Sequence, residues 1–335
     1  MMKIVIRAPN WIGDAILALP AISSLRENFP DARVWIAARD WVEDLFPSDD
    51  FIQGTIPLPK LADLKSLRLS SQKLKDFNFD IGLLLANSFS SAFLFYLTRI
   101  PERWGYSSDG RSLLLTKSVP LKNKDHSDHQ VNYYLNLISG LGFKTISPEI
   151  KLSLSQEERA AAREMLLSSG LDTAKPLVIL APGAYYGPAK RWPVPKFAEL
   201  ARMFQIRAGA EIVIVGSQDE IEIASSIAAL MEKEPWILAG KTTLRQLLGL
   251  ISQAALFVTN DSGPMHMANA LKTPVVAIFG PTDPRVTGPF QQPFAVIKKD
   301  VPCWPCLYRS CPYDHRCMMK IEPEEVFKAS HAFLK

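Results

Sequence analysis

The sequence has no segment that would hold it in a membrane. None of its apolar runs approaches the roughly 18 consecutive residues that a membrane-spanning helix needs. Its beginning runs from Met1 directly into the strand-like residues 3–7, without the long apolar core and small-residue cleavage site of a secretory signal. We therefore expect a cytoplasmic protein.

Cysteine is scarce and confined to one short segment. The four cysteines are Cys303, Cys306, Cys311 and Cys317, and His315 lies between the last two. In a reducing compartment these thiols are expected to be free or metal-bound rather than disulfide-bonded. Their spacing, C-x2-C-x4-C-x5-C, differs from the paired C-x2-C units of a zinc ribbon. A zinc site is the alternative, but we favour reduced structural thiols and expect no bound metal.

Common nucleotide and hydrolase motifs are missing as well. The absence of G-x-x-x-x-G-K-[ST] argues against a P-loop NTPase, and that of G-x-G-x-x-G against a standard dinucleotide fold. Neither H-E-x-x-H nor G-x-S-x-G occurs. His126 and His129 do not have the spacing of a metal motif, so we interpret them as structural. The net charge of +4 is mild and no basic tail appears, so we expect no nucleic-acid partner.

The residues that are present have the pattern of an α/β protein with two domains. Of 335 residues, 47% are apolar and 21% are charged, which is a normal globular composition, and the chain is long for a single core. Strand-like runs alternate with loops and helical segments in both halves, which predicts two doubly wound sheets. Ligands of such sheets bind at the carboxyl ends of the strands.

The predicted domains are residues 1–170 and residues 171–322. Residues 155–169 have the pattern of a strong helix with an acidic first turn, and residues 170–176 that of a linker. A last helix within residues 323–335 follows the cysteine segment. The sequence leaves open which of the two domains this helix packs on. One of the two possibilities is that it packs back on the N-terminal domain.

The loop at residues 260–266 contains the most informative residues of the second half. An apolar run precedes it, and a helix and a second apolar run follow, which predicts strand, loop, helix and strand. Asp261 and Ser262 are good N-cap residues, and Gly263 lets a ligand approach the backbone closely. His266 lies one turn into the helix. Such a helix start attracts anions, so a phosphate or nucleotide site is predicted, with an ordinary capped helix as the alternative.

Two further loops of the second half point to the same kind of ligand. Lys190 and Arg191 lie in the loop after its first predicted strand, where the phosphates of a ligand would be. Asp219 and Glu220 follow a later strand and have the chemistry to accept ribose hydroxyls. Three such loops at successive strand ends favour a nucleoside diphosphate.

Residues 61–77 have the pattern of an amphipathic helix with basic side chains beside an apolar face. The basic residues are Lys65, Arg68 and Lys75. One interpretation is a surface helix with solvated lysines. The other is a docking face for an acidic or membrane-bound partner.

Four stretches spread over nearly the whole chain form a recognisable set. They read N-W-I-G-D-A-I-L-A-L-P-A-I (10–22), P-G-A…K-R-W-P (182–193), A-G-K-T-T-L (239–244) and N-D-S-G-P-M-H-M-A…F-G-P-T-D-P (260–284). In this order they resemble the ADP-heptose:lipopolysaccharide heptosyltransferases of glycosyltransferase family nine. The cysteine segment, C-W-P-C-L-Y-R-S-C-P-Y-D-H-R-C-M, looks most like that of the members that add the second inner-core heptose.

The resemblance implies a GT-B architecture, with two Rossmann-like domains facing each other across a cleft. It implies an inverting transfer of L-glycero-D-manno-heptose from ADP-heptose, held by the C-terminal half, to the first heptose of the lipopolysaccharide inner core, held by the N-terminal half. No cofactor or metal is expected. Because the acceptor is an anionic glycolipid, we expect peripheral contact with the cytoplasmic face of the inner membrane, and the helix at 61–77 is the candidate for it.

The resemblance also implies roles for residues of the first half. Asp14 would be the general base. Asn10, Trp11 and Gly13, which share its loop, are candidates for contact with the acceptor. An inverting displacement does need a carboxylate opposite the departing group, so the residue type fits the role.

In the second half, Lys190 would bind the diphosphate, as the developing charge on the leaving group requires. The other implied donor-site residues are Asp219 or Glu220 at the ribose, Thr242 at the adenine, and Asp261, Ser262, Gly263 and His266. Tyr185 and Tyr186 depart from the threonines that lie near the phosphates in the first heptosyltransferase, so no phosphate contact is expected there. The alternatives are another heptosyltransferase of the family, a nucleotide-sugar epimerase, and a non-catalytic nucleotide-binding protein.

Overall fold

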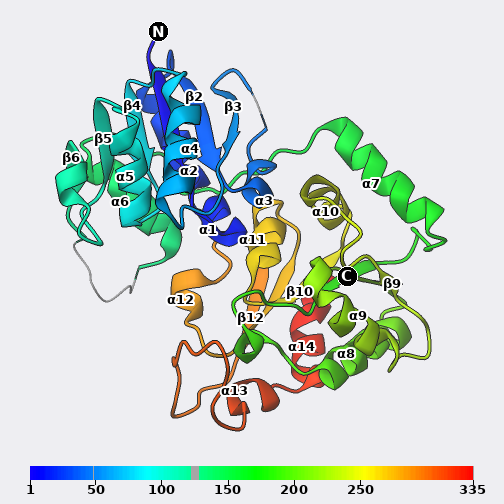
Figure 1. Cartoon of the computed structure of the whole chain (residues 1–335). Helices are drawn as coiled ribbons and strands as arrows, with labels where there is room; N and C mark the ends of the chain where they lie inside the picture. The colour runs from blue at the N-terminus through cyan, green and yellow to red at the C-terminus, as the bar shows by residue number, and fades with distance from the viewer. Residues whose placement is uncertain (48, 122–127, 335) are drawn as a thin grey trace. The chain divides into compact units, whose positions relative to one another are not determined.

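The computed structural model describes residues 1–47, 49–121 and 128–334, which form two compact units (Figure 1). The first unit comprises Met1–Ile150 and the second Lys151–Lys335. The boundary therefore precedes the helix at residues 155–169, whereas the sequence predicts a boundary after it.

Contacts of this helix, α7 (Gln156–Ser168), explain the position of the boundary. It packs on α10 (Leu244–Ile251) of the second unit. Glu158 of α7 and Arg245 of α10 form an ion pair of 2.6 Å. The helices approach closely because Gly249 has no side chain: a Cβ there would lie 3.0 Å from the Cβ of Ala162. These contacts make α7 a part of the second unit.

The described part of the first unit contains a six-stranded parallel sheet in the order β3-β2-β1-β4-β5-β6. Its strands are β1 (Lys3–Arg7), β2 (Arg33–Ala38), β3 (Ile52–Pro57), β4 (Ile81–Leu84), β5 (Glu102–Tyr106) and β6 (Lys117–Val119). The strand order reverses between β1 and β4. In a doubly wound sheet the ligand crevice lies at such a switch point.

Helices cover both faces of this sheet, as Figure 1 shows. They are α1 (Ile12–Leu17), α2 (Leu19–Asn28), α3 (Asp40–Glu43), α4 (Leu64–Lys75), α5 (Phe89–Leu97) and α6 (Gln130–Gly140), with a 3-10 turn at Ser112–Leu114. The sequence predicts one helix over residues 15–25, but the structure has α1 and α2 with a break at Ala18. Pro20 lies in the first turn of α2, where its missing N–H costs no helical hydrogen bond.

The second unit repeats the same plan in the order β12-β11-β10-β7-β8-β9, again with parallel strands. The strands are β7 (Leu177–Ala181), β8 (Glu211–Ile214), β9 (Trp236–Ile237), β10 (Leu256–Asn260), β11 (Val275–Phe279) and β12 (Phe294–Lys298). The switch point here lies between β7 and β10. Both strands are fully buried, as the apolar runs in the sequence predict.

The remaining helices of the second unit cover this sheet. They are α8 (Val194–Arg207), α9 (Ile221–Ala228), α11 (Gly263–Ala270), α12 (Pro284–Thr287), α13 (Arg316–Met319) and α14 (Pro323–Ser330), with 3-10 turns at Pro188–Lys190, Gln218–Glu220 and His331–Phe333. The C-terminal helix α14 packs on α8, and the rings of Phe327 and Phe204 lie 5.4 Å apart. Its buried Val326 belongs to the core of the second unit. The sequence leaves open whether this helix packs on either domain, and these contacts assign it to the second unit.

The prediction of an α/β chain with two Rossmann-like, doubly wound sheets is confirmed. The sequence predicts strands at residues 3–7, 33–38, 81–85, 177–181, 211–215, 236–238, 255–258 and 275–279. Four strands of the structure are therefore not predicted: β3, β5, β6 and β12. Three of them lie at sheet edges, where a strand has one neighbour and accepts polar or half-exposed residues.

Candidate active site

The switch point of the second unit brings two loops together. One loop follows β7 and carries Lys190, and the other follows β10 and carries Asp261. Because β7 and β10 are neighbours and parallel, both loops leave the same edge of the sheet. The sequence-based prediction that these loops share one site is consistent with this topology.

A buried ion pair joins the two loops. The Lys190 ammonium donates to the carboxylate of Asp261, 71 residues away along the chain. Thr282 Oγ1 donates to the same carboxylate oxygen at 2.6 Å, and the Tyr186 ring lies 4.7 Å below the ammonium. Lys190 is 9% exposed and Asp261 is 4% exposed. Asp261 therefore holds Lys190, whereas the sequence favours Asp261 as a helix cap.

Asn260 fixes the backbone around this pair. Its amide donates to the carbonyls of Pro182 at 2.7 Å and Gly183 at 3.3 Å, and its Oδ1 accepts from Trp192 N at 3.1 Å. One buried side chain thus ties both ends of the Lys190 loop to the end of β10. Asn260 is quoted in the sequence motif above, but its bonds to residues 68–78 positions away could not be predicted from the sequence.

Helix α11 begins beside the ion pair. Ser262 is its N-cap residue, but the Ser262 side chain makes no capping bond and instead lies 3.2 Å from Thr259 Oγ1. Gly263 is the first helical residue, and His266 follows one turn later with 5% of its surface exposed. The first turn of α11 therefore presents backbone N–H groups next to Lys190, as the sequence predicts.

Of the two carboxylates predicted to bind the ribose, Glu220 lies against the Lys190 loop and Asp219 faces solvent. Glu220 accepts a hydrogen bond from Ser217 N at 2.7 Å and lies against Gly183, where a Cβ would come within 1.8 Å of its carboxylate. Asp219 is exposed to solvent. The structure thus brings Glu220 to the Lys190 loop. Thr242, the candidate at the adenine, is half-buried at the end of the next loop along the sheet.

Asp14 lies at the switch point of the first unit, in the first turn of α1, directly after the loop that follows β1. Its side chain is half-buried. Two tyrosines of α6 lie near its carboxylate: burial raises the pKa of Tyr133 to about 12, and the charge of Asp14 contributes in the same direction. Burial also raises the pKa of Tyr134, with Asp14 as the next cause. The carboxylate of Asp14 therefore lies close enough to both tyrosines of α6 for its charge to act on them.

The other predicted residues of the first half, Asn10, Trp11 and Gly13, lie in the loop after β1 and in the first turn of α1, as Asp14 does. Asn10 Oδ1 accepts from Arg7 at 2.5 Å, and the Asn10 carbonyl accepts from Trp41 Nε1 at 2.9 Å. Trp11 is 48% exposed, and Gly13 is half-buried within α1. Arg7 is buried, and this burial, with the nearby charge of Arg39, lowers its pKa to about 10.

Arg111 is a second buried cation in this unit that the sequence did not suggest. Its guanidinium donates to the carbonyls of Ala86 at 2.7 Å and Tyr106 at 2.9 Å. Both carbonyls lie at the carboxyl ends of sheet strands. Arg111 thus adds positive charge near the same edge of the sheet as Asp14.

Comparison with known proteins identifies the family of the chain. Residues 67–316 match glycosyltransferase family 9 (heptosyltransferase). The chain belongs to glycosyltransferase family 9. It is 32% identical to lipopolysaccharide heptosyltransferase 2 of Salmonella typhimurium over 311 residues, which cover 89% of this chain and 88% of the relative. It is 31% identical to lipooligosaccharide heptosyltransferase 2 of Campylobacter jejuni, over 100% of this chain and 99% of the relative.

Solved structures give the same result. The ADP-heptose lipopolysaccharide heptosyltransferase II of E. coli superposes with a TM-score of 0.84 at 28% sequence identity, and the match covers 100% of this chain and 98% of that one. The protein is therefore a glycosyltransferase of family 9 with the two-domain GT-B fold, and the resemblance inferred from its sequence motifs is confirmed.

In this family 9 enzyme, the basic side chains predicted to meet a partner lie on α4. Lys65, Arg68 and Lys75 are exposed, but Leu67 and Leu74 are buried in the core that α4 shares with α5. The apolar face of the predicted amphipathic helix is therefore covered by the protein itself. None of the described helices combines the length and the apolar character needed to cross a membrane.

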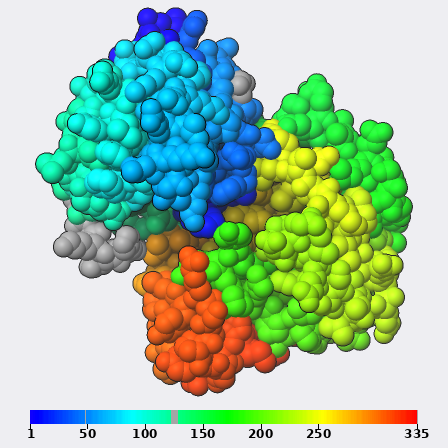
Figure 2. Space-filling view, in the orientation of Figure 1, coloured from blue at the N-terminus to red at the C-terminus, as the bar shows by residue number. Residues whose placement is uncertain are grey.

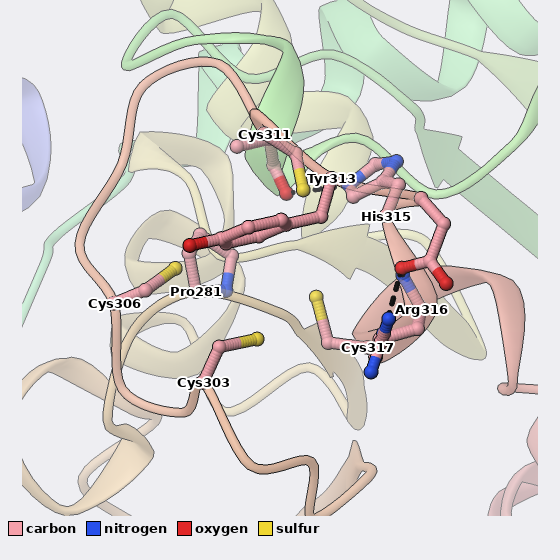
Figure 3. Close-up of a pocket in the computed structure, with 10 residues that line it drawn as sticks. Pro281, Cys303, Cys306, Cys311, Tyr313, His315, Arg316 and Cys317 are labelled. Carbon is pink, nitrogen blue, oxygen red and sulfur yellow. Dashed lines mark hydrogen bonds and ion pairs between the residues drawn. The ribbon is translucent and has the colours of Figure 1, made fainter.

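The cysteine segment of the enzyme folds around a small pocket of about 10 Å³ (Figure 3). Figure 3 shows Cys303, Cys306 and Cys317 with their thiols directed into it, and Cys311 beyond the ring of Tyr313. All four are free thiols, and among the described residues no group of histidine, cysteine and acidic side chains is arranged to hold a metal ion.

Of the two histidines interpreted as structural, His129 caps α6, where its Nδ1 accepts from Val131 N at 3.2 Å. His126 lies outside the described residues.

Proposed function

We propose that this enzyme transfers heptose from ADP-heptose to the first heptose of the lipopolysaccharide inner core, with inversion at the anomeric carbon. Its relatives over nearly the whole chain, which are named heptosyltransferase 2, support this choice of donor and acceptor. The observation that carries the proposal is the buried pair of Lys190 and Asp261 beside the start of α11, at the switch point of the second sheet.

The diphosphate of the donor would bind between Lys190 and the first turn of α11. An ammonium has three N–H donors, and Asp261 occupies one, so the others are available to phosphate oxygens. Asp261 and Thr282 fix the position of the ammonium before the donor arrives, which lowers the entropic cost of binding. Backbone N–H groups at the helix start add to the positive field around the leaving group.

The nucleoside would extend along the carboxyl edge of the same sheet. We propose that Glu220, held against Gly183, accepts a ribose hydroxyl, with Asp219 as the alternative, and that Thr242 borders the adenine. Ser262, Gly263 and His266 would line the donor from α11. Glu220 is favoured over Asp219 because it already touches the loop that carries Lys190.

Asp14 would act as the general base. In the proposed step, an acceptor hydroxyl oxygen forms a bond to the anomeric carbon and its proton passes to the Asp14 carboxylate. The bond from that carbon to the phosphate oxygen breaks, and its electron pair leaves on ADP. Lys190 and the α11 N–H groups stabilise this charge, so the proposed mechanism assigns no step to a metal.

The acceptor would be recognised around Asp14 in the first unit. Asn10, Trp11 and Gly13 lie in the same turn, and the exposed indole of Trp11 offers an apolar face to a sugar ring. Positive charge from the buried Arg7 favours an anionic acceptor in this region.

We further propose that the surface formed by α4 and α5 contacts an anionic bilayer, where a glycolipid acceptor resides. The rings of Phe89, Phe93 and Tyr96 stack along α5 with centroids 6.0 and 6.4 Å apart. In Figure 2 the light-blue residues of α4 and the cyan residues of α5 lie side by side on one face of this unit. Large exposed apolar side chains on this surface and the adjoining 3-10 turn are Leu64, Leu69, Phe89, Tyr96 and Leu113. The exposed Lys65, Arg68 and Lys75 add the positive charge that anionic lipids attract.

Product analysis tests the proposed activity. Purified enzyme is incubated with ADP-heptose and lipopolysaccharide precursors that do or do not end in the first heptose, and the lipids are analysed by mass spectrometry. Addition of one heptose to the first precursor alone is the expected result. Conversion of ADP-heptose without any acceptor would indicate an epimerase, and binding without conversion a non-catalytic protein.

A further inference from the structure

The cysteine-rich segment, residues 301–317, contacts the Lys190 loop of the proposed donor site and the loop after β11 that carries Thr282. This segment forms the orange part of the surface of the second unit in Figure 2. Its contacts with these loops are hydrogen bonds in which at least one partner is a backbone group, together with the Arg309 guanidinium beside the Tyr186 ring. None of them involves a residue assigned above to the donor itself.

The first set of contacts holds the 3-10 turn that carries Lys190. His315 Nε2 lies 2.8 Å from the carbonyl oxygen of Ala189, and Ala189 N donates to the carbonyl of Arg309 at 3.0 Å. Because a carbonyl only accepts, the His315 Nε2 must carry the proton. The backbone before the turn also fits closely: Gly187 has φ 156° and ψ 166°, and a Cβ there would lie 2.3 Å from the Arg309 oxygen.

Tyr186 joins the segment to the ammonium directly. Its hydroxyl donates to the carbonyl of Leu307 at 2.6 Å. Its ring lies 4.7 Å from the Lys190 ammonium and 5.2 Å from the Arg309 guanidinium. The segment thus fixes the ring on which Lys190 rests.

A second set of contacts holds the loop that carries Thr282. Trp304 Nε1 donates to the carbonyl of Thr282 at 3.1 Å. The backbone N–H groups of Cys306 and Leu307 both donate to the carbonyl of Pro281 at 3.1 Å. Thr282 donates a hydrogen bond to the carboxylate of Asp261, which holds Lys190. These contacts therefore support the Asp261 side of the buried ion pair.

From these contacts we infer that the cysteine-rich segment positions the buried pair for the donor diphosphate, with His315 as the positioning residue for Lys190. The inference rests on the proposed donor site. His315 does not touch the donor; it holds the backbone of Ala189, next to Lys190. Cys317 is buried in the core of the second unit and Cys303 packs against that core, whereas Cys306 and Cys311 are half-buried.

The test compares variants that differ in one hydrogen-bond donor. Glutamine has a side-chain N–H at a reach similar to that of His Nε2, so His315→Gln keeps the bond to Ala189, whereas His315→Phe removes it. Arg316→Gln is the matched control, because Arg316 bonds to the exposed Asp314 and not to either loop. ADP affinity is measured by calorimetry, and the Michaelis constants for donor and acceptor by initial rates.

We expect His315→Phe to weaken ADP binding by roughly 3- to 10-fold, the effect of one lost hydrogen bond. It should raise the Michaelis constant for the donor and leave that for the acceptor unchanged. His315→Gln and Arg316→Gln should stay within about 2-fold of the wild type. If His315 acts through Lys190, the double variant His315→Phe with Lys190→Ala should bind ADP no more weakly than Lys190→Ala alone.

The outcomes distinguish a failure of the proposed donor site from a failure of the positioning role inferred for the cysteine-rich segment. If Lys190→Ala binds ADP as the wild type does, the proposed donor site is wrong. If Lys190→Ala weakens binding but His315→Phe does not, the donor site stands and the positioning inference is overturned. If His315→Phe does not fold, Tyr186→Phe tests the same inference, because it keeps the ring and removes the bond to Leu307. An ADP affinity within 2-fold of the wild type in Tyr186→Phe would then overturn it.

Discussion

Replacing Lys190 is the most informative single perturbation of the second unit, because its ammonium is both a proposed ligand of the donor and the partner of a buried carboxylate. A charge-assisted contact to phosphate is typically worth about 1.5–3 kcal/mol. Lys190→Ala should therefore weaken ADP binding by roughly 10- to 150-fold. Affinity for the acceptor should change much less.

The same substitution has a second effect on stability. It leaves the 4%-exposed Asp261 with the Thr282 hydroxyl but without its cation. Breaking one side of a buried ion pair commonly costs about 3–5 kcal/mol. For a unit of this size we expect the melting temperature to fall by roughly 10 °C.

The two effects are separated by a second substitution. Adding Asp261→Asn removes the stranded charge and keeps much of the side-chain shape, so the melting temperature should recover. ADP affinity should stay low, because the ammonium is still missing. Calorimetry with ADP and thermal melting of both variants are the assays. If the dissociation constant for ADP is unchanged in Lys190→Ala, the reasoning about the donor site is refuted.

The remaining predictions concern the base, the membrane surface and metal dependence. Asp14→Asn removes the base but keeps the shape, so turnover should fall by roughly 10²–10⁴-fold while ADP-heptose still binds. Its melting temperature should change little, because a carboxylate in the first helical turn contributes only about 0.3–1 kcal/mol. Replacing Lys65, Arg68 and Lys75 together with Gln should reduce association with vesicles that contain anionic lipid, and make the remaining binding less sensitive to salt. Chelators should leave turnover and melting temperature unchanged.

Three results would contradict these predictions. Near-normal turnover of Asp14→Asn would exclude it as the base. Equal vesicle binding before and after the triple substitution would exclude the basic side chains of α4 as the membrane contact. Loss of activity with a chelator that zinc restores would indicate that the cysteine segment holds a metal.

Local sequence patterns are sufficient to place the two loops of the proposed donor site at one edge of the second sheet. The loop with Lys190 and the loop with Asp261 each follow a buried, apolar strand and have the composition of a turn, so the rule for parallel sheets places them at one edge. The sequence could not show that Asp261 is paired with Lys190 instead of capping α11, because that contact joins residues 71 positions apart. Thr282 was missed for the same reason.

Helix α4 shows a different limit. Its periodicity correctly predicted one apolar side, but periodicity does not reveal what covers that side. In the structure α5 covers it, and Leu67 and Leu74 are buried. Likewise, the composition of residues 170–176 suggested a linker, but the packing of α7 on α10 places the division of the chain before α7.

Transfer of heptose to a defined acceptor is the most direct test of the proposed function. The wild-type enzyme, ADP-heptose and a lipopolysaccharide precursor ending in the first heptose should give a lipid one heptose heavier by mass spectrometry, with ADP released in equal amount. The same precursor lacking the first heptose should stay unchanged. No heavier lipid from the complete precursor, or an equal gain on the precursor without the first heptose, would contradict the proposed function.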